Sequence, residues 1–264
     1  VKRKKSIGQH FLKDLKVAQD IADTVDACPN LPILEVGPGM GVLTQFLLPK
    51  ERTVKVVEVD YESVAYLREA YPQLEDNIIE DDFLKMNLQR LFDGQPFVLT
   101  GNYPYNISSQ IFFKMLDNKE LIPCCTGMIQ KEVAERMSAK PSTKDYGAIT
   151  VLCQYYTEPS IVANVPASLF VPPPKVDSAV LKLKVLDKPS VEVKDEGVFF
   201  RVVKAAFSQR RKTLLNCLSA NFPIPKDEIS TLLESIGIAP SRRGETLSLE
   251  EFANIADTLL QKIK

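Results

Sequence analysis

The sequence predicts an α/β fold, a mostly parallel and doubly wound sheet, followed by a small all-α domain. Up to about residue 185, short β-branched segments alternate with segments of helical periodicity. The strand-like segments are continuously apolar, which is typical of parallel sheets covered by helices on both faces. From residue 186 onward only helical periodicity remains. These observations predict two domains, residues 1–185 and 186–264.

The elements of the first domain follow one another in alternation. Helices are expected over 17–25, 42–48, 63–71, 132–137 and 148–155, although the β-branched residues of the last also fit a strand. Strands are expected at 33–36, 53–59, 78–79, 97–100, 127–129, 161–162 and 179–185. Sheets of this kind bind ligands at the carboxyl ends of their strands, near the point where the strand order reverses.

The second domain shows three helical patterns. Phe199, Val203 and Phe207 recur at helical spacing, and the apolar run 229–236 is stopped by Gly237. Ser248 and Glu251 form a capping box ahead of a third apolar periodic segment.

The composition excludes several classes of chemistry. His10 is the only histidine, so a metal site with several histidines cannot be built, and no metal is expected. A catalytic triad that contains histidine would have to use His10. The five cysteines show no C-x-x-C spacing, which favours free thiols in a reducing cytoplasm. No apolar run approaches the roughly 18 residues of a membrane span, and the basic N-terminus continues into polar residues rather than a secretory signal.

Three predicted strand ends offer the parts of a nucleoside pocket. The loop Gly37-Pro-Gly39-Met-Gly41 allows close approach of a ligand to the main chain, and Glu35 before it would repel a pyrophosphate. Glu58 stands 21 residues after Gly37, where a carboxylate accepts from ribose hydroxyls. Asp82 can accept from an adenine amino group and Phe83 can cover the base. A tight turn with solvated carboxylates is the alternative, but adenosine plus a cation without phosphates fits S-adenosylmethionine.

The segment Asn102-Tyr-Pro-Tyr105 follows the fourth strand and reaches the same edge of the sheet. Pro104 restricts the backbone, Asn102 supplies an amide oxygen and Tyr105 a stacking face. Asn102 and a main-chain carbonyl of Tyr103 or Pro104 could hold the two hydrogens of an adenine amine, freeing its lone pair and stabilising the charge that develops during methylation. The amine must be unpaired or flipped out of a nucleic acid to reach them. The alternative is a simple turn.

These motifs resemble those of the ribosomal RNA adenine dimethyltransferases, and those of the helical part resemble the small-subunit branch, the KsgA (RsmA) type. The resemblance runs from residue 4 to about 260. It rests on Ile7-Gly-Gln-His-Phe-Leu12, Glu35-Val-Gly-Pro-Gly39, Glu58-Val-Asp60, Gly101-Asn-Tyr-Pro-Tyr-Asn106, Phe170-Val-Pro-Pro-Pro-Lys-Val-Asp-Ser178, Ala206-Phe-Ser-Gln-Arg-Arg-Lys-Thr-Leu214 and Arg243-Gly-Glu-Thr-Leu247.

The resemblance implies a Rossmann-like methyltransferase sheet with S-adenosylmethionine as methyl donor. It implies dimethylation of two adjacent adenosines in the 3'-terminal hairpin loop of small-subunit rRNA, late in ribosome assembly. By motif match, His10 and Leu12 would line the methionine end of the cofactor beside Gly37, and Phe170 would pack on the target base opposite Tyr105. Glu58, Asp82 and Asn102 match the remaining cofactor contacts. His10 and Tyr103 depart from the asparagine and leucine frequent at these positions.

Compact basic clusters are candidate phosphate contacts for such an RNA. They give the candidate residues Lys4, Lys5, Arg210, Arg211, Lys212 and Arg243, with Arg242 alongside. The alternative is a solvated charged face. Because the net charge is only −1, we expect modest affinity for free RNA, a preassembled ribosomal subunit as partner and a monomeric cytoplasmic enzyme.

Two other functions compete. A large-subunit rRNA adenine methyltransferase of the antibiotic-resistance type would share the fold and the Asn102 motif, but the signatures around Arg210 and Arg243 argue against it. A non-catalytic ribosome assembly factor would show degraded cofactor residues, and the sequence shows none.

Overall fold

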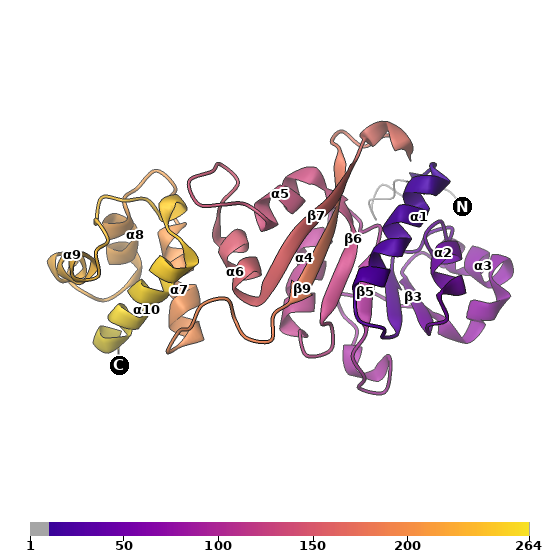
Figure 1. Cartoon of the computed structure of the whole chain (residues 1–264), viewed down its shortest axis with the longest axis horizontal. Coiled ribbons are helices and arrows are strands. Elements are labelled where there is room, and N and C mark those ends of the chain that lie inside the picture. Colours follow the sequence, from indigo (N-terminus) through magenta and orange to yellow (C-terminus); the bar gives the residue numbers. More distant parts are fainter. Residues whose placement is uncertain (1–10, 264) are drawn as a thin grey trace. The chain divides into compact units, whose positions relative to one another are not determined.

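The computed structural model describes residues 11–263 and divides into two compact units (Figure 1). The first takes the chain up to Ala134 together with Glu158–Val185, and the second takes Glu135–Thr157 and Leu186 onward. Across residues 11–263, no helix is long and apolar enough to cross a membrane.

The first unit is built on a seven-stranded sheet in the order β4-β3-β2-β5-β6-β9-β7. The strands are β2 (Ile33–Val36), β3 (Val54–Glu58), β4 (Ile78–Glu80), β5 (Val98–Gly101), β6 (Cys124–Gln130), β7 (Thr157–Val165) and β9 (Ser178–Val185). The pairs from β4 to β6 are parallel, and β9 runs antiparallel to β6. The strand order reverses between β2 and β5, so the loops after these strands meet where such sheets bind ligands. The predicted α/β class is confirmed.

Helices and short turns connect these strands. The helices are α1 (Leu15–Asp23), α2 (Thr44–Leu47), α3 (Tyr61–Ala70), α4 (Ser108–Asp117) and α5 (Lys131–Met137), the last containing the boundary between the units. The 3-10 turns are η2 (Thr24–Ala27), η3 (Leu48–Lys50), η4 (Pro72–Asn77), η5 (Leu88–Arg90) and η6 (Ala167–Leu169). Two short strands, β1 (Phe11–Leu12) and β8 (Phe170–Val171), pair antiparallel apart from the main sheet.

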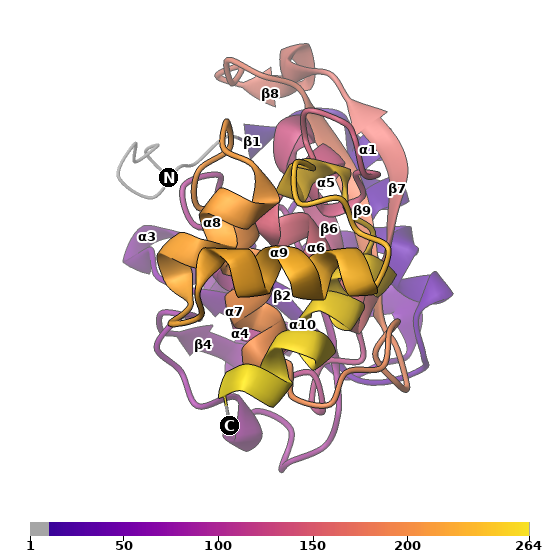
Figure 2. The same cartoon turned by 90° about the vertical axis from the view of Figure 1, so that its left-hand side faces the viewer.

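The second unit is helical, as Figure 2 shows for the helices facing the viewer. It contains α6 (Ala148–Tyr156), α7 (Glu196–Ala206), α8 (Leu214–Asn221), α9 (Lys226–Ser235), η7 (Gly244–Thr246) and α10 (Leu249–Ile263). The predicted capping box is present, because the Ser248 amide donates to Glu251 at 3.1 Å and the Glu251 amide donates to the Ser248 hydroxyl at 3.2 Å. Phe199, Leu247 and Phe252 belong to a single core.

The segment 135–157 packs differently from its expected place in the first domain. Tyr146, Val151 and Tyr155 are buried in the same core as Phe199. The Tyr146 hydroxyl also donates to the Leu247 carbonyl at 2.6 Å. These partners lie far along the chain, so local periodicity could not show to which core the segment belongs.

The expectation of five free thiols is wrong for two of them. Cys28 and Cys124 form a disulfide, with a sequence separation of 96 residues and 5.9 Å between their Cα atoms. Cys28 follows η2 and Cys124 begins β6, so the fold brings together residues whose spacing gives no sign of it. Cys125, Cys153 and Cys217 are free and buried.

Candidate functional site

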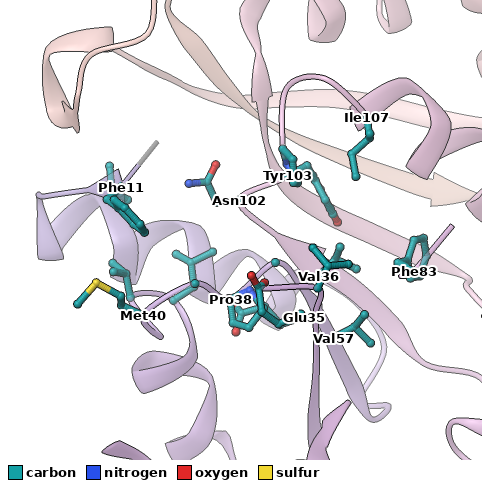
Figure 3. Close-up of a pocket in the computed structure, with 18 of the residues that line it drawn as sticks. Phe11, Glu35, Val36, Pro38, Met40, Val57, Phe83, Asn102, Tyr103 and Ile107 are labelled. Atoms are coloured by element: carbon teal, nitrogen blue, oxygen red, sulfur yellow. The ribbon is translucent and has the colours of Figure 1, made fainter. Parts of the chain in front are cut away.

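A cavity open to solvent lies at the carboxyl ends of the parallel strands and has a volume of about 970 Å³ (Figure 3). Its walls come from the loops that follow β2, β3, β4 and β5, together with Phe11 and Leu12 of β1. The position is the reversal point of the sheet, where folds of this kind bind their ligands.

Nine of the residues predicted from the sequence line this one cavity. They are Leu12, Gly37, Gly39, Glu58, Asp82, Phe83, Asn102, Pro104 and Tyr105. Further lining residues had not been predicted, among them Phe11, Met40, Val57, Asp81 and Ile107. Most of these are apolar residues next to predicted ones, and proximity to a strand end was the one signal that could have found them.

The glycine loop after β2 keeps the cavity open at its base. Gly37 and Gly39 have φ values of 67° and 56°, which side chains other than glycine rarely adopt. A Cβ atom at Gly37 would lie 3.7 Å from Pro104 Cδ, and one at Gly39 would lie 3.6 Å from Phe11 Cε1. Side chains at either glycine would therefore occupy space that the cavity now offers to a ligand.

Two buried carboxyl groups give the cavity an acidic wall. Glu35 is 1% exposed and Glu58 is 5% exposed, and the Thr44 hydroxyl donates to Glu35. The pKa of Glu35 is raised to about 8, chiefly by burial; the hydrogen bond from Thr44 opposes this rise and the nearby Glu58 adds to it. With this pKa Glu35 is protonated at neutral pH, so it gives the wall a hydrogen-bonding carboxyl group rather than a fixed negative charge.

The loop after β4 forms a tight turn around Asp82. The Asp82 carboxylate accepts from the Leu84 amide at 2.9 Å, and its carbonyl accepts from the amides of Lys85 and Met86 at 3.0 and 3.1 Å. Phe83 is buried while lining the cavity. The turn thus presents a carboxylate and an aromatic ring side by side.

The loop Asn102–Tyr105 is anchored on β6. Asn102 forms a parallel bridge with Met128, and the Tyr103 amide donates to the Met128 carbonyl at 3.1 Å. The Tyr103 side chain is buried, and its hydroxyl donates to the Thr126 carbonyl at 2.6 Å. In the view of Figure 3 the Asn102 amide lies between Phe11 and Tyr103. The backbone of the loop is therefore held in one place at the cavity edge.

Tyr105 is held by the strand that follows the proline-rich segment. Its hydroxyl is hydrogen-bonded to the hydroxyl of Ser178 at the start of β9. Burial raises the pKa of Tyr105, so the phenol is neutral at physiological pH. The ring is thus fixed where it lines the cavity.

Phe170 does not take the place expected for it. It is fully buried in a cluster with Leu12, Ile21 and Val180, and it is not part of the cavity wall. The reason is its strand pairing, which sets Phe170 opposite Leu12 in the register of β1 and β8. A buried ring offers no face to a base in this arrangement. The other N-terminal candidates, His10, Lys4 and Lys5, lie outside the described residues.

The basic candidates of the second unit differ in whether other residues of the unit hold their side chains. Arg242 is structural, since it donates to both Glu251 carboxylate oxygens and to the Thr246 carbonyl. Arg210 is exposed but engaged by Glu245 at 3.3 Å and by the Lys144 carbonyl. The side chains of Arg211, Lys212 and Arg243 are exposed.

No group of three or more histidine, cysteine, aspartate or glutamate side chains that could hold a metal ion occurs within residues 11–263.

The chain matches known proteins over its full length. The family described as "Ribosomal RNA adenine dimethylase" matches residues 1–261. A protein of Bacteroides fragilis named "Ribosomal RNA small subunit methyltransferase A" is 62% identical, covering 100% of this chain and 94% of that protein. A protein of Porphyromonas gingivalis with the same name is 51% identical, covering 98% of each.

Solved structures show the same fold. A dimethyladenosine transferase from Plasmodium falciparum has a TM-score of 0.78 at 27% identity, covering 96% of this chain and 98% of that one. The 23S rRNA methyltransferase ErmE has a TM-score of 0.72 at 29% identity, covering 95% of this chain and 100% of that one. With the family match over residues 1–261 and relatives above 50% identity, the chain belongs to the ribosomal RNA adenine dimethylase family.

Proposed function

We propose that this chain uses S-adenosylmethionine to dimethylate the N6 atoms of two adjacent adenosines in the 3'-terminal hairpin loop of small-subunit rRNA. Membership of the family establishes the enzyme class, an rRNA adenine dimethyltransferase, and S-adenosylmethionine as its cofactor. The names of the relatives at 51–62% identity support the small-subunit branch. The observation that carries the proposal is the meeting of the glycine loop, Glu58, Asp82 and Asn102 in one cavity.

The residues of this cavity fit the cofactor group by group. Glu58 would accept from the ribose hydroxyls, Asp82 from the adenine amino group, and Phe83 would cover the adenine ring. Gly37 and Leu12 would lie at the methionine end, with the acidic wall of Glu35 nearby. The glycine loop leaves the space that the ligand needs.

The loop Asn102–Tyr105 prepares the adenine amine for attack. S-adenosylmethionine supplies a methyl group on a sulfonium, which is a good leaving group, so no strong base is required. Asn102 would accept one amine hydrogen and the Tyr103 carbonyl the other, because the Pro104 carbonyl already accepts from the Ile107 amide at 3.2 Å. Both acceptors would stabilise the positive charge that develops on nitrogen. Tyr105, held by Ser178, would stack on the flipped base.

The second unit supplies contacts to the RNA in this proposal. Arg211, Lys212 and Arg243 are exposed and can reach phosphates, whereas Arg210 would have to exchange its ion pair with Glu245. A net charge of −1 supports a preassembled ribosomal subunit, rather than free RNA, as the partner of a monomeric cytoplasmic enzyme.

The test is methylation of unmethylated small ribosomal subunits with labelled S-adenosylmethionine, followed by mapping of the modified nucleosides by mass spectrometry. Dimethyladenosine at two adjacent loop adenosines is the expected result. The structural likeness to ErmE makes large-subunit RNA the second candidate substrate. Label found only in large-subunit RNA would favour that activity, and cofactor binding without methylation of either RNA would favour a non-catalytic assembly factor.

A further inference from the structure

Lys114 links the helix behind the Asn102–Tyr105 loop to the turn that carries Asp82 and Phe83. It lies on α4, which begins three residues after Tyr105. Its ammonium donates to the carbonyls of Phe83 and Met86, the latter at 2.6 Å. The same nitrogen lies 5.3 Å from the centre of the Phe83 ring. One side chain thus holds the turn at three points.

Within residues 11–263, the other hydrogen bonds of this turn are local. Asp81 accepts from the Asp82 amide, and Asp82 accepts from the amides of Leu84, Lys85 and Met86. These bonds fix the shape of the turn but not its position against the cavity. Lys114 is 28 residues beyond Met86 in the sequence and supplies that long-range contact.

The charge of Lys114 also faces the carboxylates of the turn. Partial burial lowers the pKa of Lys114, while Asp82 and Asp81 oppose that shift. The ammonium therefore offsets the negative charge of Asp81 and Asp82, which both line the cavity.

We propose that Lys114 is a positioning residue that holds Asp82 and Phe83 where they receive the adenine of the cofactor. The inference deepens the proposed function and rests on its assignment of the adenine end. It predicts that loss of the ammonium weakens cofactor binding and leaves the methyl-transfer step nearly unchanged. The loss of affinity should depend on the 6-amino group of adenine, because Asp82 is the acceptor for that group.

The test compares Lys114→Met with Lys114→Arg by calorimetric binding of S-adenosylhomocysteine in the absence of RNA. Lys114→Met should bind about tenfold more weakly, the scale of one lost hydrogen bond to a charged group, and Lys114→Arg should recover most of the affinity. KM for S-adenosylmethionine should rise similarly, with kcat at saturating cofactor within about twofold of wild type.

Lys55→Met is the matched control. Lys55 also donates to a carbonyl, that of Leu91, and lies 5.0 Å from the centre of the Phe92 ring, but neither partner lines the cavity. Equal losses of affinity in Lys55→Met and Lys114→Met would show a general effect of destabilisation and overturn the proposal. Unchanged binding in Lys114→Met would overturn it directly.

A cofactor analogue isolates the adenine contact. S-inosylhomocysteine lacks the 6-amino group, so Lys114→Met should weaken its binding much less than that of S-adenosylhomocysteine. Equal weakening of both ligands would overturn the proposed action through Asp82. If Lys114→Met does not fold, Lys114→Gln, which keeps an uncharged donor group, takes its place, and the same results support or overturn the proposal. Glu58→Ala separates the two claims, because unchanged binding in that variant would overturn the cofactor assignment itself.

Discussion

Tyr103 occupies the space that a side chain at position 127 would need. A Cβ atom built on Gly127 would lie 2.3 Å from Tyr103 Cε2 and 2.4 Å from the Gly101 carbonyl oxygen. Tyr103 also donates to the neighbouring Thr126 carbonyl, so the ring cannot move aside without losing that bond. The backbone beside Asn102 is thus fixed because the large Tyr103 side chain, which follows β5, fills the space left by the missing side chain of Gly127 in β6.

Gly127→Ala is expected to destabilise the protein by about 1–3 kcal/mol, because overpacking a filled core forces side chains and backbone to shift. Urea unfolding measures the loss. Gly147→Ala is the matched control, since nothing lies within 4 Å of the position its Cβ would take, and it should change stability by less than about 1 kcal/mol. The combination Gly127→Ala with Tyr103→Leu should recover part of the loss, and strict additivity of the two changes would contradict the shared space.

Much of the site could be predicted from the sequence because its parts follow strands that are recognisable locally. The strand predicted at 33–36 is observed with those bounds, and the loops after β2, β3, β4 and β5 carry the predicted residues. Parallel strands bring their carboxyl ends together, so the list of loop residues already implied a common cavity.

The parts that could not be predicted depend on contacts between distant segments. The burial of Phe170 follows from the pairing of β8 with β1, and the disulfide follows from the approach of Cys28 to β6. Arg242 stands in a basic cluster of the sequence, but its guanidinium is held by Glu251 and the Thr246 carbonyl. Neither periodicity nor motif spacing contains this information.

Glu58→Ala should weaken binding of S-adenosylhomocysteine by about 1–3 kcal/mol, because a buried acceptor for two ribose hydroxyls is lost. Calorimetry without RNA measures the change. Glu69→Ala, which removes an exposed carboxylate from α3, serves as control and should bind like wild type. An affinity for Glu58→Ala equal to that of the control would refute the ribose role.

Asn102→Ala should lower kcat by about 10²–10³-fold, since a preorganised acceptor for the developing charge is removed. Cofactor-independent binding to small subunits should change little, because Asn102 contributes one neutral contact to a surface dominated by phosphates. Single-turnover methylation and filter binding separate the two effects. A wild-type rate in this variant would exclude the acceptor mechanism.

Arg242 and Arg243 are adjacent in sequence, but their substitution should affect different properties, protein stability for Arg242 and RNA binding for Arg243. Arg242→Ala removes the ion pair of Glu251, which keeps the Ser248 amide as a donor, and removes the donor to the Thr246 carbonyl, so it should cost about 1–3 kcal/mol of stability. Arg243→Ala removes an exposed cation and should leave stability within about 0.5 kcal/mol while reducing the salt dependence of RNA binding by roughly one phosphate contact. Thermal unfolding and binding at several salt concentrations distinguish the two, and a reversal of this pattern would exclude a phosphate contact for Arg243.

Glu35 should make the protein less stable as the pH rises. Its pKa is raised from 4.5 in the unfolded chain to about 8 in the folded protein, chiefly by burial. Between these values the folded state binds a proton that the unfolded state has released, so the free energy of unfolding falls with pH. The stabilisation is complete below about pH 4.5 and is lost through about pH 8. The slope from this one group is at most about 1.4 kcal/mol per pH unit.

Glu35→Gln keeps an acceptor for Thr44 and carries no titrating proton. Its free energy of unfolding, measured with urea, should therefore depend less on pH between pH 5 and 8 than that of wild type. The same slope in both proteins would mean that Glu35 is ionised in the folded state.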